Sequence, residues 1–334
     1  MRISLECAKM ARETLQKKEE FEMYYIGIDL GGTNMKAALV NEACEIVAKK
    51  SIPTVAEHSA EELVRDMAHL SLDVVAEAGV AAADVKAVGI GIPGSVNSEA
   101  GVIIYTCNLP FRNTNIRKIF REVFDVPVFI GNDADCAALG EAFAGASKDC
   151  RHSMMITLGT GVGGGIIIDK KIYSGFNGIG GELGHMVIVY DGAPCGCGRK
   201  GCWEAYSSAT GLIRMTGEAM DTHPESLMWK LCTRDNVSGK TAFQAEAQGD
   251  AAAAEVVDKY VSYLACGISN IINIFQPEVL CIGGGVSKEG DNLLKRLVPK
   301  VEKECYNRDV EKTRICIATL GNDAGLIGAA MLGR

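Results

Sequence analysis

The pattern that most restricts the fold of this chain is a strand, a glycine-rich turn and a second strand, an arrangement that occurs twice about 130 residues apart. Residues 24–40 form the first copy and residues 154–168 form the second, with its turn expected over 159–165. The tetrapeptide Gly-Asn-Asp-Ala is also repeated, at 131–134 and at 321–324, each time after a strand-like run and before small residues typical of a packed helix. Together the two repeats indicate a duplicated unit of strands and helices.

The segments between the repeats also alternate between helix and strand. Ser59 and Glu62 form a capping box, apolar residues follow at helical spacing, and Gly79 ends the run, which predicts an amphipathic helix. Residues 85–92 and 126–130 are apolar runs of strand length bounded by turn residues. This alternation is typical of the α/β class.

Length, charge and cysteine content exclude several classes of protein. The chain has 334 residues, with 34 Lys plus Arg against 42 Asp plus Glu and a net charge of −8. This length suggests two domains, and the acidic balance offers no broad basic face for nucleic acid. The uncharged stretch 154–168 contains five glycines and is too short for a membrane-spanning helix. Thirteen cysteines, an odd number, and a charged N-terminus are unlike a secreted disulfide framework, so we expect a cytoplasmic protein.

Two glycine patterns match a dinucleotide-binding fingerprint formally but lack its context. The glycines at 159, 161 and 164 precede Ile166, Ile167 and Ile168, which predict a strand where the fingerprint requires a helix. The pattern at 89–94 contains Pro93 and has no helix behind it. The chain also has no G-x-x-x-x-G-K-[ST] motif. Hydride transfer and a P-loop are therefore excluded.

The turn of the first hairpin, Asp29-Leu30-Gly31-Gly32-Thr33-Asn34, is a candidate phosphate site. Its glycines let backbone N–H groups approach an anion, Thr33 and Asn34 add side-chain donors, and Asp29 could hold Mg²⁺ beside the phosphates. Taken alone, the motif also suits a plain β-hairpin. Two further glycine turns at strand ends favour nucleotide binding, and they are Gly159-Thr160-Gly161 and Gly283-Gly284-Gly285.

Asn132 and Asp133 lie between a predicted strand and a predicted helix. An aspartate at such a junction can cap the helix or act as a general base. Asp323 occurs in the same local context. Spacing alone leaves both roles open for both aspartates.

Three thiols, Cys195, Cys197 and Cys202, lie within eight residues, separated by glycines that permit tight turns. His185 lies ten residues upstream and would complete a Cys₃His zinc site, although a chain with thirteen cysteines also clusters some by coincidence. Four protein ligands close the coordination sphere, so this zinc would be structural. Glu182 and Glu204 flank the loop and are either solvated or suited to bind the hydroxyls of a polyol.

The segment Glu182-Leu183-Gly184-His185, followed by Cys195-Gly196-Cys197-Gly198-Arg199-Lys200-Gly201-Cys202-Trp203-Glu204, resembles the ROK sugar kinases. The resemblance extends from Tyr24 to the C-terminus. It implies an α/β actin- or hexokinase-like (RNase H-like) fold of two domains with a cleft between them. It also implies Asp133 as the catalytic base, sugar contacts from Asn132, Glu182, His185 and Glu204, nucleotide contacts from the three glycine turns, and zinc on His185 with the three cysteines. Asp323 would then cap the last helix.

The resemblance implies ATP- and Mg²⁺-dependent phosphorylation of a hexose at its primary hydroxyl. Glucose is the expected substrate, with N-acetylmannosamine, N-acetylglucosamine and allose as alternatives, because residues 106–111 give no match to a particular sugar. The small domain is expected over 24–131 with 319–334 and the large domain over 132–318. A homodimer is expected from the family. A sugar-responsive repressor or a silent sugar sensor is the alternative class, although the extension at 1–23 is too short for a winged helix-turn-helix.

Overall fold

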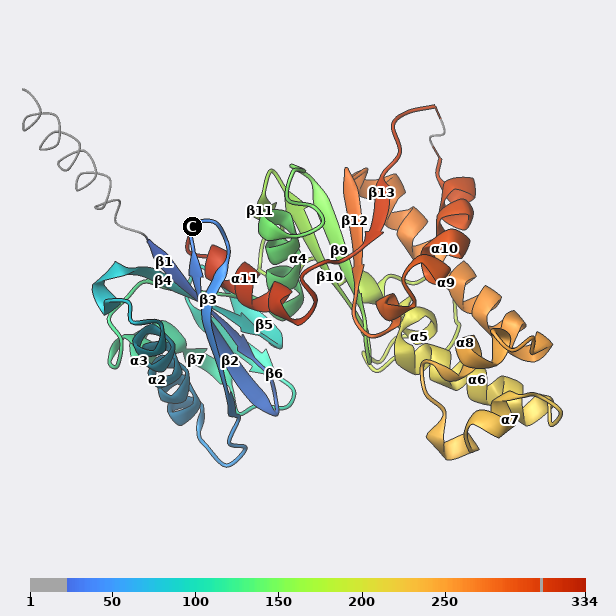
Figure 1. Cartoon of the computed structure of the whole chain (residues 1–334), viewed down its shortest axis with the longest axis horizontal. Coiled ribbons are helices and arrows are strands. Elements are labelled where there is room, and N and C mark those ends of the chain that lie inside the picture. The colour runs from blue at the N-terminus through green and yellow to red at the C-terminus, as the bar shows by residue number, and fades with distance from the viewer. Residues whose placement is uncertain (1–22, 307–308) are drawn as a thin grey trace, which may run out of the picture.

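The computed structural model describes residues 23–306 and 309–334, so the extension expected over 1–23 lies, apart from Met23, outside the described residues. The chain forms two lobes, with the N-terminal half of the sequence in one and most of the C-terminal half in the other (Figure 1). Each lobe is built around one five-stranded sheet.

The first sheet contains the first predicted hairpin and both predicted strands that follow it. Its strand order is β3-β2-β1-β4-β8, with β1, β2 and β3 antiparallel and with β4 and β8 parallel to β1. The strands are β1 (Tyr24–Leu30), β2 (Asn34–Asn41), β3 (Ile46–Pro53), β4 (Val85–Ile92) and β8 (Val128–Asn132).

The second sheet repeats this arrangement. Its order is β11-β10-β9-β12-β13, again with three antiparallel strands followed by two strands parallel to the first of the hairpin. The strands are β9 (Ser153–Leu158), β10 (Val162–Ile168), β11 (Lys171–Ile172), β12 (Val279–Gly283) and β13 (Arg314–Ile317). The predicted duplication and the predicted α/β, actin- or hexokinase-like class are confirmed.

Strand β10 begins earlier than the sequence predicts. Residues 163–165 were expected in the turn, but they lie in the strand, where their backbones pair with β9. A Cβ on Gly163 would crowd the Thr157 side chain of β9, and a Cβ on Gly165 would clash with Ala138 of the neighbouring helix. Gly163 therefore serves close packing on the paired strand and Gly165 close packing on the helix, rather than the turn.

Both sheets bury side chains on their two faces. In β1, Ile26 and Ile28 face a core shared with helix α2 (Ala60–Ala78), whereas Tyr25 faces the interior between the lobes. Helix α2 has the predicted capping box and ends at Gly79, whose φ of 67° suits glycine. A small sheet of β5 (Gly94–Asn97), β6 (Val102–Thr106) and β7 (Arg112–Asn115) and the helix α3 (Ile116–Arg121) complete this lobe.

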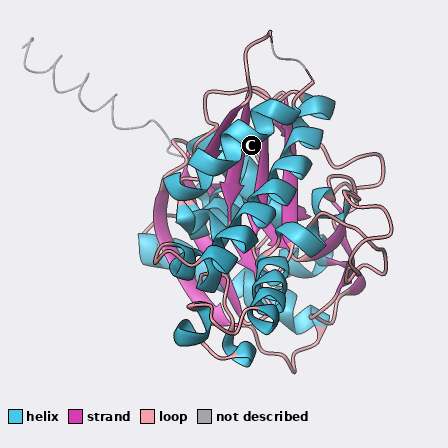
Figure 2. Ribbon diagram, turned by 90° about the vertical axis from the view of Figure 1, so that its right-hand side faces the viewer, coloured by secondary structure: helices cyan, strands magenta, loops and turns pink. Residues whose placement is uncertain are grey.

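Helices cover the outer face of the second sheet, as Figure 2 shows. Helix α9 (Ala251–Phe275) packs on β9 and β12 through a long buried face. The other helices are α5 (Glu204–Ser207), α6 (Ala209–Thr222), α7 (Met228–Leu231), α8 (Thr241–Glu246) and α10 (Asp291–Glu304). Within 23–306 and 309–334, no helix combines the length and the apolar character needed to cross a membrane.

Two helices cross between the sheets and join the lobes. Helix α4 (Asp133–Ala144) packs on β9 and β10, and helix α11 (Ala324–Met331) packs on β1 and β4. The helices contact each other where Gly140 faces Gly328, and a Cβ on Gly328 would clash with the carbonyl oxygen of Cys136. The residue pair thus fixes how closely the lobes approach at this crossing.

Asp323 precedes α11 but does not cap it as expected. It occupies the N-cap position without a side-chain hydrogen bond to the helix backbone. Its Oδ1 instead accepts a hydrogen bond from Lys49 Nζ of β3 at 2.7 Å. The preceding 3₁₀ turn at Gly321–Asp323 supplies a backbone bond from Ala324 to Gly321, so the helix start does not depend on the aspartate side chain.

Candidate functional site

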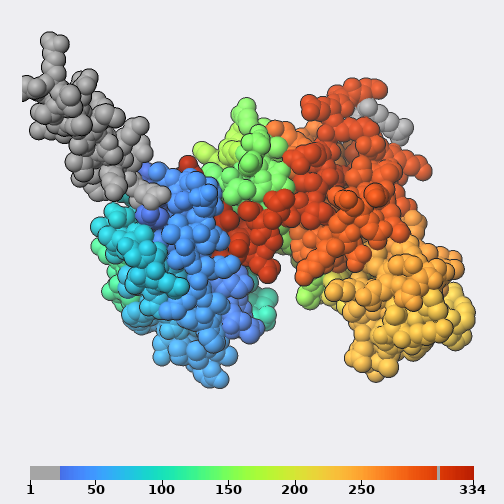
Figure 3. Space-filling model, in the orientation of Figure 1, coloured from blue at the N-terminus to red at the C-terminus, as the bar shows by residue number. Residues whose placement is uncertain are grey.

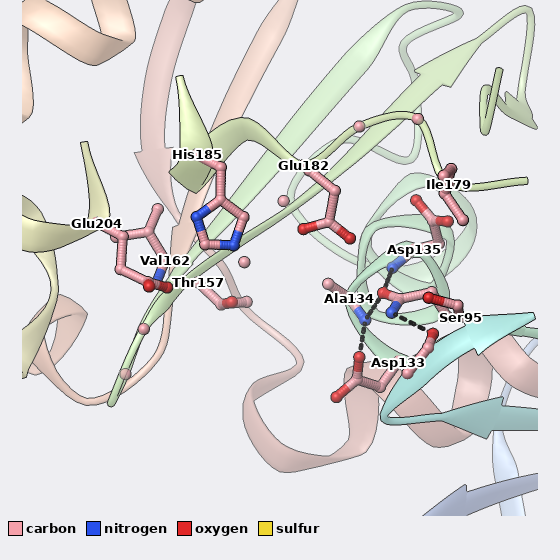
Figure 4. Close-up of a pocket in the computed structure, with 18 of the residues that line it drawn as sticks. Ser95, Asp133, Ala134, Asp135, Thr157, Val162, Ile179, Glu182, His185 and Glu204 are labelled. Atoms are coloured by element: carbon pink, nitrogen blue, oxygen red, sulfur yellow. Dashed lines mark hydrogen bonds between the residues drawn. The ribbon is translucent and has the colours of Figure 1, made fainter. Parts of the chain in front are cut away.

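A cavity of about 390 Å³ opens between β5 of the first lobe and the second lobe. The surface is visibly hollowed between the lobes in Figure 3. The start of α4, the turn between β9 and β10 and the segment before His185 line the cavity, and Figure 4 shows their side chains converging on one space. The lining includes Asn132, Asp133, Asp135, Gly159, Thr160, Gly161, Glu182, His185, Glu204 and Gly284.

Asn132, rather than Asp133, caps helix α4. Its Oδ1 accepts hydrogen bonds from the N–H groups of Ala134 at 2.8 Å and Asp135 at 3.4 Å, and its Nδ2 donates to the carbonyl oxygen of Gly94 at 3.3 Å. Asn132 therefore ties the start of α4 to the first lobe. Asp133 needs to supply no cap, so its carboxylate is available to the cavity (Figure 4).

Asp133 lies at the positive end of the α4 dipole, yet the pKa of its carboxyl is raised. Desolvation by the cavity walls is the main cause of the raised pKa, and the charges of Asp29 and Glu182 raise it further. The hydrogen bond that Asp133 Oδ1 accepts from the Ala134 N–H lowers the pKa and offsets part of this effect. A carboxylate made more basic in this way is suited to accept a proton.

Glu182 and Glu204 reach the cavity from opposite sides of His185 (Figure 4). Glu204 Oε2 accepts a hydrogen bond from the N–H of Val162 at 3.0 Å, which connects α5 to the turn of the second hairpin. Glu204 Oε1 also accepts from Cys195 Sγ at 3.4 Å. The cavity wall, the glycine turn and the cysteine loop are therefore connected through one carboxylate.

The four side chains predicted to bind zinc lie together. The sulfurs of Cys195, Cys197 and Cys202 and a ring nitrogen of His185 are all within 4.8 Å of one another. Cys195 Sγ is 3.7 Å from His185 Nδ1, and Cys197 Sγ is 3.7 Å from Cys202 Sγ. A tetrahedral zinc with bonds of about 2.3 Å to sulfur would hold sulfurs about 3.8 Å apart. The donor set and its spacing fit that ion.

The first glycine turn lies at the same sheet edge as Asp133 but does not line this cavity. Its shape is set by a hydrogen bond from the Gly31 N–H to the carbonyl oxygen of Asn34 at 3.0 Å. Asp29 forms a 3.5 Å ion pair with Lys36 and is close enough to influence Asp133. Gly32 and Thr33 are exposed at the turn.

The third glycine turn reaches the cavity with one residue. Gly284 lines it, with a φ of 86° that suits glycine, whereas Gly283 and Gly285 do not line it. A Cβ on Gly284 would crowd the backbone of Leu158, so this turn packs directly against the end of β9. The structure thus places the second and third turns beside each other.

Asp135 is a cavity residue that the sequence analysis missed. Its side chain is buried at the cavity floor, and its Oδ1 has no hydrogen-bond partner. Desolvation, followed by the charges of Glu182 and Asp133, raises the pKa of Asp135 to about 7. An aspartate in the first turn of a helix usually needs no explanation beyond the helix dipole, so the sequence carried no signal for this burial.

Comparison with known proteins agrees with this arrangement. A curated glucokinase of Halalkalibacterium halodurans is 38% identical over 313 residues, covering 93% of this chain and 95% of the relative. A curated N-acetyl-D-glucosamine kinase of Aliivibrio fischeri is 36% identical over 93% of this chain and 99% of the relative. The crystal structure of a ROK family glucokinase from Streptomyces griseus with glucose and AMPPNP superposes with a TM-score of 0.75 at 32% identity, covering 92% of this chain and 98% of that one.

The expected sugar-kinase motifs, the duplicated sheets and these relatives all lead to one family. The sequence model of the ROK family matches residues 25–334, which is nearly the whole described chain. This chain belongs to the ROK family.

Proposed function

We propose that this protein is a hexose kinase that transfers the terminal phosphoryl group of ATP to the primary hydroxyl of a hexose, with glucose as its preferred substrate. The observation that carries the proposal is Asp133, a carboxylate with a raised pKa at the N-terminus of α4, facing a polar cavity beside the glycine turn of β9 and β10. The glucokinase relatives support the reaction and the substrate.

Asp133 accepts the proton of the primary hydroxyl as that oxygen attacks the terminal phosphorus of ATP. Asn132, Glu182, His185 and Glu204 hold the other hydroxyls of the sugar, since all four line the same cavity as Asp133. A carboxylate that accepts hydrogen bonds from two neighbouring hydroxyls fixes the orientation of the sugar. Such positioning is a large part of the catalysis of phosphoryl transfer.

The three glycine turns bind ATP. Gly159, Thr160 and Gly161 line the cavity beside Gly284, while residues 29–34 lie outside this lining, at the sheet edge next to Asp133. Exposed backbone N–H groups in such turns suit phosphate oxygens. Asp29 is the residue that would hold Mg²⁺, and the cation would neutralise charge on the phosphates.

His185, Cys195, Cys197 and Cys202 hold a structural zinc ion. His185 Nδ1 faces the sulfurs, and the ring also lines the cavity, so the same side chain serves the metal and the sugar. Metal analysis of protein purified without added metal should give about one zinc per chain. Protein without zinc would contradict this assignment.

From its family we also propose how the chain divides into domains, where the protein is located and that it forms a dimer. The small domain comprises 24–131 with 319–334, the large domain comprises 132–318, and the protein is a cytoplasmic homodimer. Light scattering on the purified chain tests the dimer. A mass of one chain, 35.5 kDa, would refute it.

The test of the function is ATP-dependent ADP release with glucose, N-acetylglucosamine, N-acetylmannosamine and allose as separate substrates. Glucose should give the highest kcat/KM, and the product should be the 6-phosphate. N-acetylglucosamine kinases are also among the relatives. A higher kcat/KM for N-acetylglucosamine would refute glucose as the preferred substrate but would leave the proposed kinase reaction intact. No turnover on any sugar, in folded protein that contains zinc, would refute the kinase.

A further inference from the structure

The turn between β9 and β10 uses only some of its backbone N–H groups within the protein. The Gly159 N–H donates to the carbonyl oxygen of Gly161 at 3.0 Å, which closes the turn. The Val162 N–H donates to Glu204 Oε2 at 3.0 Å. In the described part of the chain, nothing accepts a hydrogen bond from the N–H of Thr160 or of Gly161. These two consecutive N–H groups are therefore available to a ligand.

The carbonyl groups of the same peptides are held by the start of helix α6. The carbonyl oxygen of Gly159 accepts from the Ala209 N–H at 2.8 Å, and that of Thr160 accepts from Thr210 Oγ1 at 2.8 Å. Ala209 is the first residue of α6, where helix N–H groups have no acceptor within the helix and can bond elsewhere. Ala209 and Thr210 do not line the cavity, so both carbonyl groups point towards residues outside its lining.

The planarity of the peptide group fixes where the two available N–H groups point. In a trans peptide the C=O and the N–H of one plane point in opposite directions, and no peptide bond within 23–306 and 309–334 is cis. The Thr160 N–H shares its plane with the carbonyl that Ala209 binds, and the Gly161 N–H shares its plane with the carbonyl that Thr210 binds. Both N–H groups are therefore directed away from α6, from residues that line the cavity.

Two successive N–H groups that point into one space form a binding site for an anion. We propose that Thr210 is a positioning residue for the phosphate groups of the nucleotide. Its hydroxyl fixes the plane of the peptide between Thr160 and Gly161 and so holds the Gly161 N–H towards a phosphate oxygen. Without that bond the peptide plane has to be ordered when the nucleotide binds, which weakens binding. The inference rests on the proposed function for the identity of the anion.

Two variants separate the hydroxyl of Thr210 from the rest of its side chain. Thr210→Val keeps the shape and removes the donor, whereas Thr210→Ser keeps the donor. Isothermal titration with AMPPNP, an ATP analogue that is not hydrolysed, measures the effect without turnover. We expect Thr210→Val to raise the Kd for AMPPNP about fivefold and Thr210→Ser to stay within about twofold of the wild type.

Steady-state kinetics add a readout that general damage to the fold would not reproduce. Thr210→Val should raise the KM for ATP about fivefold and leave the KM for the sugar within about twofold of the wild type, because the bond orders the phosphate turn alone. Thr222→Val is the matched control, since it removes the same hydroxyl at the other end of α6, where the group bonds the carbonyl oxygens of Glu218 and Ala219. It should keep the wild-type Kd and both KM values.

An unchanged Kd for AMPPNP in Thr210→Val would overturn the proposal, and so would equal losses in Thr210→Val and Thr210→Ser. A parallel rise in the sugar KM would also overturn it, because the whole cavity would then be disturbed. Protein that shows the expected difference between the variants in titration but phosphorylates none of the sugars tested would refute the proposed function and keep this inference. Wild-type protein that binds no AMPPNP would refute both.

Discussion

The two halves of this molecule share one topology but carry different chemistry at equivalent positions. In each half a hairpin and two parallel strands lead to a helix that begins with Asn-Asp-Ala and packs on the sheet of the other half. In the first half, Asn132 caps the helix and leaves Asp133 facing the cavity, where the pKa of its carboxyl is raised. In the second half, Asp323 caps nothing and is paired with Lys49 at the surface.

This difference shows that the tetrapeptide specifies the start of a helix and that the surroundings specify its use. Asp133 faces a cavity bordered by Glu182 and by the second hairpin, and these surroundings raise the pKa of its carboxyl. The side chain of Asp323 is 37% exposed and has a cation within 2.7 Å. Its charge is paired with Lys49 and it does not line the cavity, which leaves it with no role as a base.

The sharpest way to test the comparison is to make the same substitution in both halves. Asp133→Asn should lower kcat by about 10²- to 10⁴-fold because it removes the general base. Asp323→Asn should change kcat less than twofold. Steady-state ADP release measures both, and comparable losses in the two variants would refute the distinction between the aspartates.

The cysteine loop proposed to hold zinc is a second difference, because Glu204 connects it to the turn of the second hairpin through bonds with Cys195 and Val162. Cys202 is fully buried beside this loop, so Cys202→Ser should abolish zinc binding and lower the free energy of unfolding by about 3–5 kcal/mol. The matched control is Cys266→Ser on α9, which leaves the cluster intact. Denaturant unfolding and metal analysis should give loss of zinc and stability in the first variant alone.

The acid side of the pH profile tests the state of Asp133. Its pKa is raised above 3.8, and the ionised form is the base, so kcat/KM should fall as the pH decreases through a value above that of an ordinary aspartate. Each pH unit below the midpoint should cost about tenfold. A profile that stays flat down to pH 4 would show that Asp133 is not desolvated as described.

The helix crossing is where the two halves depend on each other most directly. Gly328→Ala should destabilise the protein by about 1–3 kcal/mol or more, since the new methyl group meets the backbone of α4 at Cys136. Gly325→Ala is the control on the same helix, because no atom lies near the added Cβ, and it should be neutral or stabilise by about 0.5 kcal/mol. Thermal unfolding that gave the two variants the same Tm would show that the crossing has room to adjust.

The sequence predicted much of this comparison because its signals are local. Strand alternation, the capping box at Ser59 and the ligand spacing at 195–202 depend on residues close in the chain, and the structure confirms the strands and the box and brings the ligands together. The strand position of 163–165 was missed because these glycines are required by tertiary contacts, such as that of Gly165 with Ala138 of α4. Asp135 was missed because burial depends on the same packing.

The smallest expected effect concerns the cation that accompanies Asp323. Both partners of the Lys49 pair are more than a third exposed, so Lys49→Met should change the free energy of unfolding by at most about 1 kcal/mol, as should Lys50→Met in the similar pair with Asp73.

The informative measurement places Lys49→Met in the Asp133→Asn background. If the Lys49 cation were the only reason that Asp323 does not act as a base, removing this cation would restore some turnover. We expect none, because Asp323 does not line the cavity that would hold the sugar and the nucleotide. Recovered ADP release would mean that the duplicated helix start can serve as a base in either half, and that the location of the cavity is less decisive than the charge beside the carboxylate.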